Sequence, residues 1–349
     1  MIIINGRYLC QRMTGIQRFA YEITNSLMQI ADVPVVVLAP QNIREEYNIQ
    51  NWDVRKIGGK GSHFWEQCTL PHYMRNHFNN DILLNLSGLS PIGYHNNIMT
   101  IHDMSYLVHS RSFSIIYRLY YRLLTPIAAR KARHLVTVSE FSKHEIIRYL
   151  HLDASKITVI YNAVHPSPLA SKKDMPRYIL SVCSLEPRKN LHRLIESYLH
   201  IPDKDFDLYL IGGGDAVFSN PDLQPYQNIP HVHFLGYLND EKLQSYYRNA
   251  IAYVNASLYE GFGIPNLEAM QQKCAIAISD IPAYREVCED AAIYFNPMDT
   301  KDIQNKIIEI THNETLKNSL VKKGDNQLLK FSWEQSANQL LKILLPTKL

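Results

Sequence analysis

Residues 257–270 read Ser-Leu-Tyr-Glu-Gly-Phe-Gly-Ile-Pro-Asn-Leu-Glu-Ala-Met, and this stretch is the most informative of the chain. It follows an apolar run at residues 250–254 that is typical of a buried strand. Gly261 and Gly263 permit positive φ angles and a close approach of the backbone to a ligand. Pro265 suits the first turn of a helix, where its missing N–H costs no hydrogen bond. The stretch predicts a strand, a glycine turn and a helix N-terminus, whose amides and positive dipole end favour a diphosphate.

Two carboxylates flank this turn: Glu260 stands just before it, and Glu268 lies one helical turn into the helix. At the carboxyl end of a strand both can face a ligand crevice and accept hydrogen bonds from sugar and ribose hydroxyls. The structural alternative is that Glu268 only complements the helix dipole and that Glu260 is solvated. Because the two carboxylates occur together with the glycines, we favour ligand binding.

A second motif, Glu-Pro-Arg-Lys-Asn at residues 186–190, follows an apolar run at residues 178–182. Arg188 could clamp a pyrophosphate through its planar guanidinium, and Lys189 could neutralise it as a point charge. The alternative is an exposed basic turn. Both motifs leave the carboxyl ends of predicted strands, so they can converge on one ligand.

Short apolar runs alternate with amphipathic segments along the whole chain, as expected for strands that helices cover on both faces. The predicted fold class is α/β, with two doubly wound, Rossmann-like domains, and a length of 349 residues supports two cores. A segment with three prolines, residues 165–176, is the best linker. It separates an N-terminal domain, residues 1–165, from a C-terminal domain, residues 166–330. Strands are expected at residues 2–5, 34–38, 82–86, 98–101, 135–138, 157–160, 178–182, 208–211, 232–235, 250–254, 275–278 and 292–295.

Composition excludes several classes of protein. The five cysteines are scattered without a Cys-x-x-Cys pair, so neither a disulfide framework nor a thiolate zinc site is indicated. No apolar run approaches the roughly 18 residues of a spanning helix, and no signal peptide is recognisable, so we expect a cytoplasmic location. The glycines at residues 212–214 do not complete a dinucleotide fingerprint, and the aspartates at 203, 205 and 207 are interpreted as a solvated turn rather than a metal site.

Charge is distributed unevenly between the predicted domains. Residues 1–165 hold 17 lysines and arginines against 11 acidic residues, a balance of +6, whereas the remainder holds 19 against 22, a balance of −3. The segment from Arg111 to His134 has six cationic residues, no acidic one and three interleaved tyrosines. Such a basic, amphipathic helix can lie on anionic lipid, although an ordinary helix with a solvated basic face would show the same pattern. No nucleic-acid-binding motif accompanies it, so nucleic acid is not an expected partner.

The two motifs together resemble the retaining GT-B glycosyltransferases of family 4, bacterial enzymes that build O-antigens, capsules and related polysaccharides. The family's hallmark is a pair of glutamates separated by seven residues, which Glu260 and Glu268 match. The resemblance covers nearly the whole chain: the family's N-terminal glycine loop is matched at residues 13–19, and further segments match at 100–103, 138–142 and 159–164. Ala163 replaces the usual glycine, a local departure.

The resemblance implies a role for each matching residue. Glu268 would hold the nucleotide ribose, and Glu260 the hydroxyls of the donor sugar. Arg188 and Lys189 would neutralise the pyrophosphate and improve the leaving group. The resemblance also implies that residues 1–165 form the acceptor and membrane side, that residues 166–330 form the nucleotide-sugar donor domain, and that the donor crevice lies between them. It further implies a C-terminal helix, residues 331–349, that crosses back to the N-terminal domain. Other expected contacts are the backbone amides of Phe262 and Gly263, the phosphate approach of Gly15, the base-lining Tyr237 and Leu238, and His102 near the reacting sugar.

The implied reaction is transfer of a hexose with retention of configuration, in which the leaving phosphate takes the acceptor's proton. Neither a side-chain nucleophile nor a metal or other cofactor is then required. The donor would be a GDP- or UDP-sugar, of which GDP-mannose is favoured. The acceptor would be a lipid-linked or oligosaccharide chain at the inner face of the plasma membrane. The alternatives are a GT-B nucleotide-sugar epimerase and a non-catalytic protein that binds sugar nucleotides.

Overall fold

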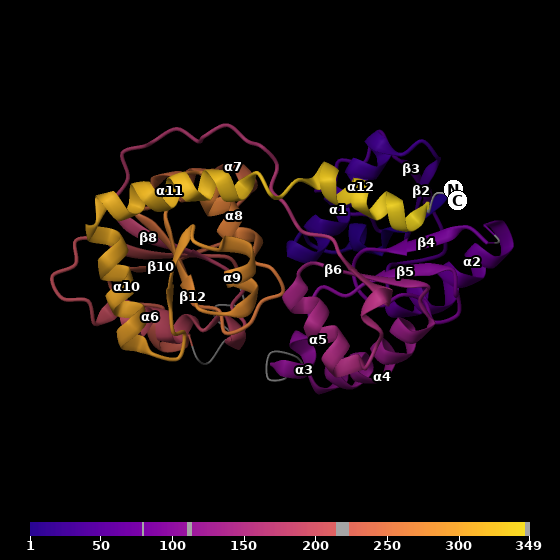
Figure 1. The fold of residues 1–349 in the computed structure, drawn as a ribbon, viewed down its shortest axis with the longest axis horizontal. Helices are drawn as coiled ribbons and strands as arrows, with labels where there is room; N and C mark the ends of the chain where they lie inside the picture. The colour runs from indigo at the N-terminus through magenta and orange to yellow at the C-terminus, as the bar shows by residue number, and fades with distance from the viewer. Residues whose placement is uncertain (79, 110–113, 214–222, 346–349) are drawn as a thin grey trace. The chain divides into compact units, whose positions relative to one another are not determined.

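The computed structural model describes residues 1–78, 80–109, 114–213 and 223–345 (Figure 1). The chain divides into two compact units, and each is described by itself. Unit 1 comprises Met1–Asn162 with the C-terminal helix, and unit 2 comprises Ala163–Phe331. The proline-rich segment therefore counts with unit 2, because Ser167 and Ala170 hydrogen-bond to the side chains of Gln271 and Gln272.

Unit 1 is built on a seven-stranded parallel sheet in the order β3-β2-β1-β4-β5-β6-β7. Its central strands are short and fully buried, which is why the sequence shows continuous apolar runs there. The exception is the edge strand β3, which is mostly exposed and reads Asp-Val-Arg-Lys. The strands are β1 (Ile2–Asn5), β2 (Val35–Ala39), β3 (Asp53–Lys56), β4 (Ile82–Asn85), β5 (Asn97–Thr100), β6 (His134–Thr137) and β7 (Ile157–Val159).

Helices connect these strands, and the last helix of the chain, α12 (Trp333–Leu344), also belongs to unit 1. The Ser332 side chain caps α12 by accepting a hydrogen bond from the Gln335 amide. Trp333 is buried edge-on against Phe19 of α1, with ring centroids 6.1 Å apart, so the apolar face of α12 rests on α1 (Figure 1). The other helices are α1 (Gly15–Ile30), α2 (Leu70–His77), α3 (Ser105–Val108), α4 (Ile115–Lys131) and α5 (Glu140–Leu150).

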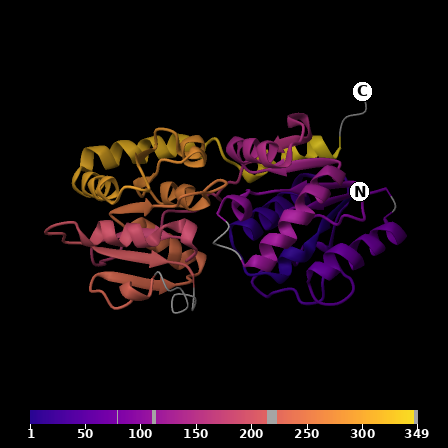
Figure 2. The same ribbon diagram turned by 90° about the horizontal axis from the view of Figure 1, so that it is seen from below.

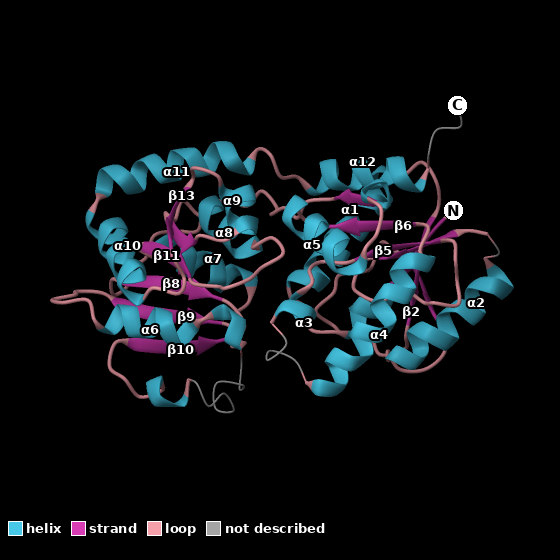
Figure 3. Ribbon diagram, turned by 60° about the horizontal axis from the view of Figure 1, so that its bottom comes forward, coloured by secondary structure: helices cyan, strands magenta, loops and turns pink. Residues whose placement is uncertain are grey.

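Unit 2 holds a six-stranded parallel sheet in the order β10-β9-β8-β11-β12-β13. The chain starts at the central strand β8 and adds β9 and β10 towards one edge of the sheet. It then returns to the centre at β11 and adds β12 and β13 towards the other edge. Since parallel crossovers are right-handed, helices of the two halves cover opposite faces of the sheet (Figures 2 and 3). The strands are β8 (Tyr178–Val182), β9 (Asp207–Ile211), β10 (Val232–Gly236), β11 (Ala252–Asn255), β12 (Ile276–Ser279) and β13 (Ala292–Phe295). The helices are α6 (Leu191–Leu199), α7 (Asp240–Asn249), α8 (Ile264–Gln271), α9 (Pro282–Cys288), α10 (Thr300–His312) and α11 (Glu314–Leu328).

Each sheet reverses its strand order once: between β1 and β4 in unit 1, and between β8 and β11 in unit 2. Ligands of doubly wound sheets bind outside the carboxyl ends of the strands at such a switch point. In unit 2 the two sequence motifs leave these two strands. The fold prediction of two parallel, doubly wound sheets is thus confirmed. Within the described residues, none of the helices combines the length and the apolar character that crossing a bilayer requires.

Candidate active site

The loops after β8 and β11 run side by side because these strands pair in parallel, with Ala252 opposite Ile179. The first loop continues into a single 3₁₀ turn, Pro187–Lys189, and ends at Asn190 in the left-handed region with a φ of 59°. A backbone hydrogen bond joins the loops, since the Leu258 amide donates to the Arg188 carbonyl at 2.8 Å. The two motifs therefore meet at the switch point of unit 2.

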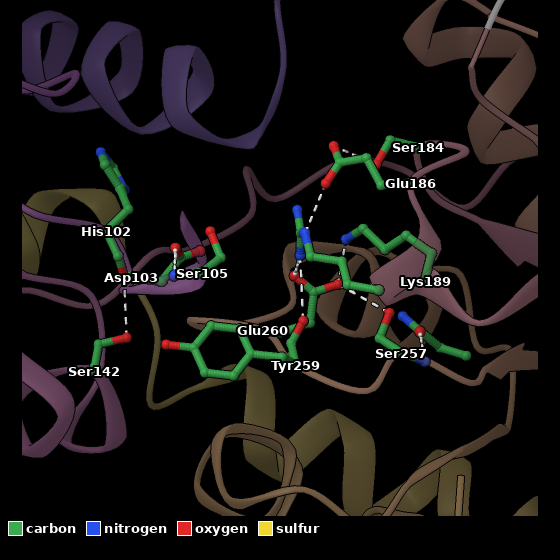
Figure 4. A network of polar contacts seen from close by, with 12 residues as sticks. His102, Asp103, Ser105, Ser142, Ser184, Glu186, Lys189, Ser257, Tyr259 and Glu260 are labelled. Carbon is green, nitrogen blue, oxygen red and sulfur yellow. Dashed lines mark hydrogen bonds and ion pairs between the residues drawn. The ribbon is translucent and has the colours of Figure 1, made fainter. Parts of the chain in front are cut away.

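Three predicted site residues form one ion-pair cluster there (Figure 4). The Arg188 guanidinium donates to one carboxylate oxygen of Glu260 at 3.0 Å, and the Lys189 ammonium donates to the other. The Ser257 hydroxyl also donates to Glu260, at 3.0 Å. Arg188, Lys189 and Glu260 are each little exposed, with 11–13% of the side-chain surface open to solvent. The structure thus brings both cations and one of the two glutamates together.

The electrostatics of Glu260 show how strongly the two cations act on it. Burial alone would raise the pKa of its carboxyl group, but the charges of Lys189 and Arg188 outweigh burial and lower the pKa to about 2. The carboxylate is therefore ionised at neutral pH and neutralises one of the two positive charges. A ligand with two or more negative charges could therefore replace Glu260 as the partner of both cations.

Glu186, which the sequence analysis left without a role, completes the cluster. Its carboxylate accepts from Arg188 Nε at 2.7 Å and from the Ser184 hydroxyl at 3.0 Å. It therefore orients the guanidinium from the side opposite Glu260. Asn190, also missed, is fully buried and donates to the carbonyls of Ala256 and Pro297. Both residues belong to the motif at residues 186–190. Their position in the sequence next to Arg188 and Lys189 could have identified them as part of the site.

The glycine turn before α8 has the conformation that the sequence predicted. Gly263 has a φ of 97° and caps α8, which begins at Ile264 with Pro265 in its first turn. A Cβ on Gly263 would lie 2.5 Å from the ring of Tyr284, so glycine is required both for the backbone angle and for space. The Phe262 side chain is buried edge-on against Phe331, which fixes the turn from the other side.

Glu268 lies on α8, as predicted, and one of its oxygens accepts from the buried Tyr247 hydroxyl of α7 at 3.0 Å. This contact fixes the carboxylate in one rotamer. Tyr237 and Leu238 follow the carboxyl end of β10, which is separated from β8 by β9, and 49% of the Tyr237 surface is exposed. All these groups belong to the same edge of the unit 2 sheet as the ion-pair cluster.

The two remaining predicted site residues, Gly15 and His102, belong to unit 1. Gly15 is the first residue of α1, and its surface is exposed. His102 follows β5, its Nε2 donates to the Leu86 carbonyl at 2.9 Å, and its ring meets Phe19 edge-on. Burial lowers the pKa of His102, which favours the neutral ring. The hydrogen bond to Leu86 is the kind of structural contact that a histidine at a strand end commonly makes.

Two of the aspartates of the predicted solvated turn, Asp205 and Asp207, pair with basic side chains. Asp205 accepts from Arg177, and Asp207 is bonded by His231 and His233 at 2.8 Å each. Among residues 1–78, 80–109, 114–213 and 223–345, no group of three or more His, Cys, Asp or Glu side chains is arranged to hold a metal ion. The dinucleotide-like glycine run extends to Gly214, which lies outside the described residues.

Two family models together match most of the chain. Residues 13–167 match the model described as Glycosyltransferase Family 4, and residues 168–327 match Glycosyl transferases group 1. The chain is 33% identical over 219 residues to the O-antigen chain mannosyltransferase RfbU of Salmonella typhimurium, covering 62% of this chain and 61% of that protein. It is 30% identical over 227 residues to the O-antigen chain mannosyltransferase B of Escherichia coli, covering 60% and 59%. The matched region thus spans about three fifths of each relative's length.

Solved structures resemble the whole chain at lower sequence identity. WaaG, a glycosyltransferase involved in lipopolysaccharide biosynthesis, superposes with a TM-score of 0.78 at 13% identity and covers 99% of this chain and 100% of its own. Anabaena Alr3699/HepE in complex with UDP and glucose gives a TM-score of 0.76 at 14% identity, covering 98% of both chains. These likenesses show that the chain has the GT-B fold.

Proposed function

The chain belongs to the group 1 glycosyltransferases, and from that premise we propose that it transfers a hexose from a nucleotide-diphospho-sugar to a lipid-linked or oligosaccharide acceptor in surface-polysaccharide biosynthesis. The observation that carries the proposal is the Arg188–Lys189–Glu260 cluster at the switch point of unit 2. Two partly buried cations beside the N-terminus of α8 suit a diphosphate, which is the group shared by all such donors.

The cluster also suggests an order of events. The diphosphate replaces Glu260 as the partner of Arg188 and Lys189, because it carries more negative charge than a single carboxylate. Glu260 then accepts hydrogen bonds from hydroxyls of the donor sugar, while Glu268, held by Tyr247, accepts those of the ribose. The amides of Phe262 and Gly263, next to the start of α8, would donate to the sugar or phosphate. Tyr237 and Leu238 would line the base, while the roles of Gly15 and His102, which belong to unit 1, stay predictions from the family resemblance.

The proposed transfer retains the configuration of the anomeric carbon. The acceptor oxygen bonds to the anomeric carbon as the bond from that carbon to the phosphate oxygen breaks, and the departing phosphate oxygen takes the acceptor's proton. Arg188 and Lys189 stabilise the negative charge that develops on the leaving diphosphate, the work that a metal ion does in other transferases. The reaction then needs no metal, no other cofactor and no side-chain nucleophile.

The proposed donor is GDP-mannose. The relatives with about 30% identity are named O-antigen mannosyltransferases, which supports mannose. A UDP-hexose is the second candidate, since the HepE structure that shares the fold contains UDP. Thermal-shift measurements with GDP, UDP and dTDP and their sugars would distinguish the bases, and the base that stabilises the protein most identifies the donor.

A nucleotide-sugar epimerase and a non-catalytic binding protein are the competing functions. The test is release of nucleoside diphosphate from each donor with and without acceptor. A transferase releases it in proportion to transferred sugar, an epimerase turns over the donor without acceptor, and a binding protein does neither. Absence of transfer over a full panel of donors and lipid-linked glycans would contradict the proposal.

We also propose that α4 contacts an anionic membrane at its cytoplasmic face, where a lipid-linked acceptor would lie. Several apolar side chains of α4 are exposed, including Ile116 at 83%, Leu119 at 57% and Leu123 at 58%. Arg122 is exposed beside them, and Arg118 is partly exposed. Exposed apolar and basic side chains on one helix suit the interface of an anionic bilayer. Arg111, part of the predicted segment, lies outside the described residues.

A further inference from the structure

Tyr284 of α9 packs against the glycine turn of the candidate active site. Its side chain is fully buried, and a Cβ built on Gly263 would lie 2.5 Å from the Tyr284 ring. The ring therefore fills the space beside the turn, a role that phenylalanine would serve equally well. The hydroxyl group needs a different explanation, because it makes no hydrogen bond within the described part of the chain.

A buried hydroxyl without a partner destabilises a fold, since it gives up its hydrogen bonds to water and gains none in return. Asn266 shows the same feature beside the same turn. Its Nδ2 would lie 2.9 Å from a Cβ on Gly263, and among the described residues neither polar atom of its side chain has a hydrogen-bond partner. Such groups are rare in folded proteins, and a functional role is one of the few reasons for keeping them. The hydrogen bonding around the turn is therefore incomplete.

Glu260 is the charged group that acts on the Tyr284 hydroxyl. Burial is the largest influence that raises the pKa of Tyr284 well above its ordinary value, and the negative charge of Glu260 is the next. A weak contact with the Ser257 hydroxyl acts in the opposite direction. The same Ser257 hydroxyl donates to Glu260 at 3.0 Å (Figure 4). The Tyr284 hydroxyl thus lies close to the serine that holds Glu260, and it stays protonated and able to donate.

The binding of a diphosphate creates a need for such a donor. In the proposed order of events the diphosphate takes over Arg188 and Lys189, so that Glu260 loses its bonds to both cations. A carboxylate with only 13% of its side-chain surface exposed is strongly disfavoured without opposite charges or hydrogen-bond donors. Ser257 supplies one donor. A second donor nearby would lower the cost of displacing the carboxylate.

We propose that the Tyr284 hydroxyl is a positioning group, which donates to the Glu260 carboxylate once a diphosphate has displaced Glu260 from Arg188 and Lys189. The inference rests on the proposed function, because it requires a diphosphate at the two cations. Glu260 keeps its negative charge in this arrangement, and its other lone pairs face the hydroxyls of the donor sugar. Tyr284 itself touches no substrate and acts through Glu260.

The test is nucleotide binding by the full chain, measured by isothermal titration with GDP, UDP and dTDP. Tyr284→Phe keeps the ring against Gly263 and removes only the hydroxyl. The matched control is Tyr198→Phe, because Tyr198 is also a fully buried tyrosine of unit 2 but donates to the Phe206 carbonyl at 2.7 Å. Tyr284→Phe is also combined with Glu260→Gln. Urea unfolding without nucleotide is measured for every variant.

We expect Tyr284→Phe to bind the nucleoside diphosphate of the wild type about tenfold more weakly, through the loss of one hydrogen bond to a charged group. Its urea midpoint should stay unchanged or rise, because the hydroxyl that is removed has no partner within the described residues. Tyr198→Phe should show the reverse pattern, a lower midpoint with unchanged nucleotide affinity. In the Glu260→Gln background, Tyr284→Phe should weaken binding by about threefold or less, because the displaced side chain carries no charge.

Unchanged nucleotide affinity in Tyr284→Phe overturns the inference. Weaker binding also overturns it if the urea midpoint falls or if the full loss persists in the Glu260→Gln background, because the tyrosine then only supports the turn. In these cases the wild type still binds a nucleoside diphosphate, and the proposed function stands. A wild type that binds no nucleoside diphosphate and transfers no sugar contradicts the proposed function itself, and the inference with it.

Discussion

Glu260 is the residue whose interpretation changes most once its contacts in the structure are known. The sequence identified it as a carboxylate beside a glycine turn, and the structure shows it bonded to both cations of the second motif. Positions 186–190 and 260 could be predicted to converge because both motifs follow parallel strands. The ion pairing itself could not be predicted, since it depends on side-chain rotamers and on the partial burial of the cluster.

Replacing Glu260 by glutamine should separate binding from transfer. The carboxylate competes with a diphosphate for Arg188 and Lys189, so Glu260→Gln should leave nucleoside-diphosphate affinity unchanged or increase it. Transfer should fall by about 100-fold, because the charged acceptor of the sugar hydroxyls is lost. Isothermal titration with GDP and UDP and a transfer assay measure the two effects. Weaker nucleotide binding with unchanged transfer would contradict this role.

Glu66 should make stability depend on pH. Burial raises its pKa to about 7 in the folded protein, although the Arg7 charge acts in the opposite direction. Between pH 4.5 and 7 the unfolded carboxyl is ionised while the folded one stays protonated, so stability falls as pH rises. The free energy of unfolding of Glu66→Gln should not fall in this way. Its difference from the wild type should therefore shift by about 3 kcal/mol in favour of the variant as the pH rises from 4.5 to 7. Urea unfolding at several pH values checks this.

The matched control for the Glu66 experiment is Glu45→Gln, which changes an exposed carboxylate in the same unit. Its free energy of unfolding should follow that of the wild type across the range. A constant difference between Glu66→Gln and the wild type from pH 4.5 to pH 7 would show that the Glu66 pKa is not raised.

At the scale of elements, the buried parts of the fold were predictable and the polar edges were not. Helices such as α1 and α6 could be predicted because amphipathic periodicity marks them in the sequence. Strand β3 was missed, since an edge strand in contact with solvent needs no apolar run. The π-helical turn before α2, Trp65–Thr69, was also missed, because no sequence pattern distinguishes it from ordinary helix.

The turn between β11 and α8 should tolerate no side chain at Gly263. A Cβ would lie 2.5 Å from Tyr284 and 2.9 Å from Asn266, at a φ of 97°. Gly263→Ala should therefore lower the free energy of unfolding by about 1–3 kcal/mol. Gly59→Ala is the control, since a Cβ there meets nothing within 4 Å. Equal stability of the two variants in urea unfolding would contradict the account of this turn.

Helix α4 should bind anionic vesicles through its basic side chains. The double variant Arg118→Glu/Arg122→Glu reverses two charges and should lose most co-sedimentation with phosphatidylglycerol-containing liposomes. Binding of the wild type should weaken at high salt. The control Lys143→Glu/Arg148→Glu makes the same change of charge on α5. Equal vesicle binding by the two double variants would contradict the proposal that α4 contacts the membrane.

At the scale of the whole molecule, the sequence predicted two doubly wound units, and the structure and its likeness to GT-B glycosyltransferases confirm this. The structure places the boundary between Asn162 and Ala163 and assigns α12 to unit 1. The identity of the sugar and base could not be predicted, because one or two hydroxyl or base contacts decide it and the matched motifs recognise only the shared diphosphate.

The most direct test of the central claim is acceptor-dependent release of nucleoside diphosphate by the wild type and by Lys189→Ala. If the cluster in unit 2 is the diphosphate site of a glycosyltransferase, the wild type releases one nucleoside diphosphate for each sugar transferred. Lys189→Ala should then lower kcat by about 100-fold or more, because the leaving group loses its point charge. Release at the wild-type rate by Lys189→Ala would contradict the claim.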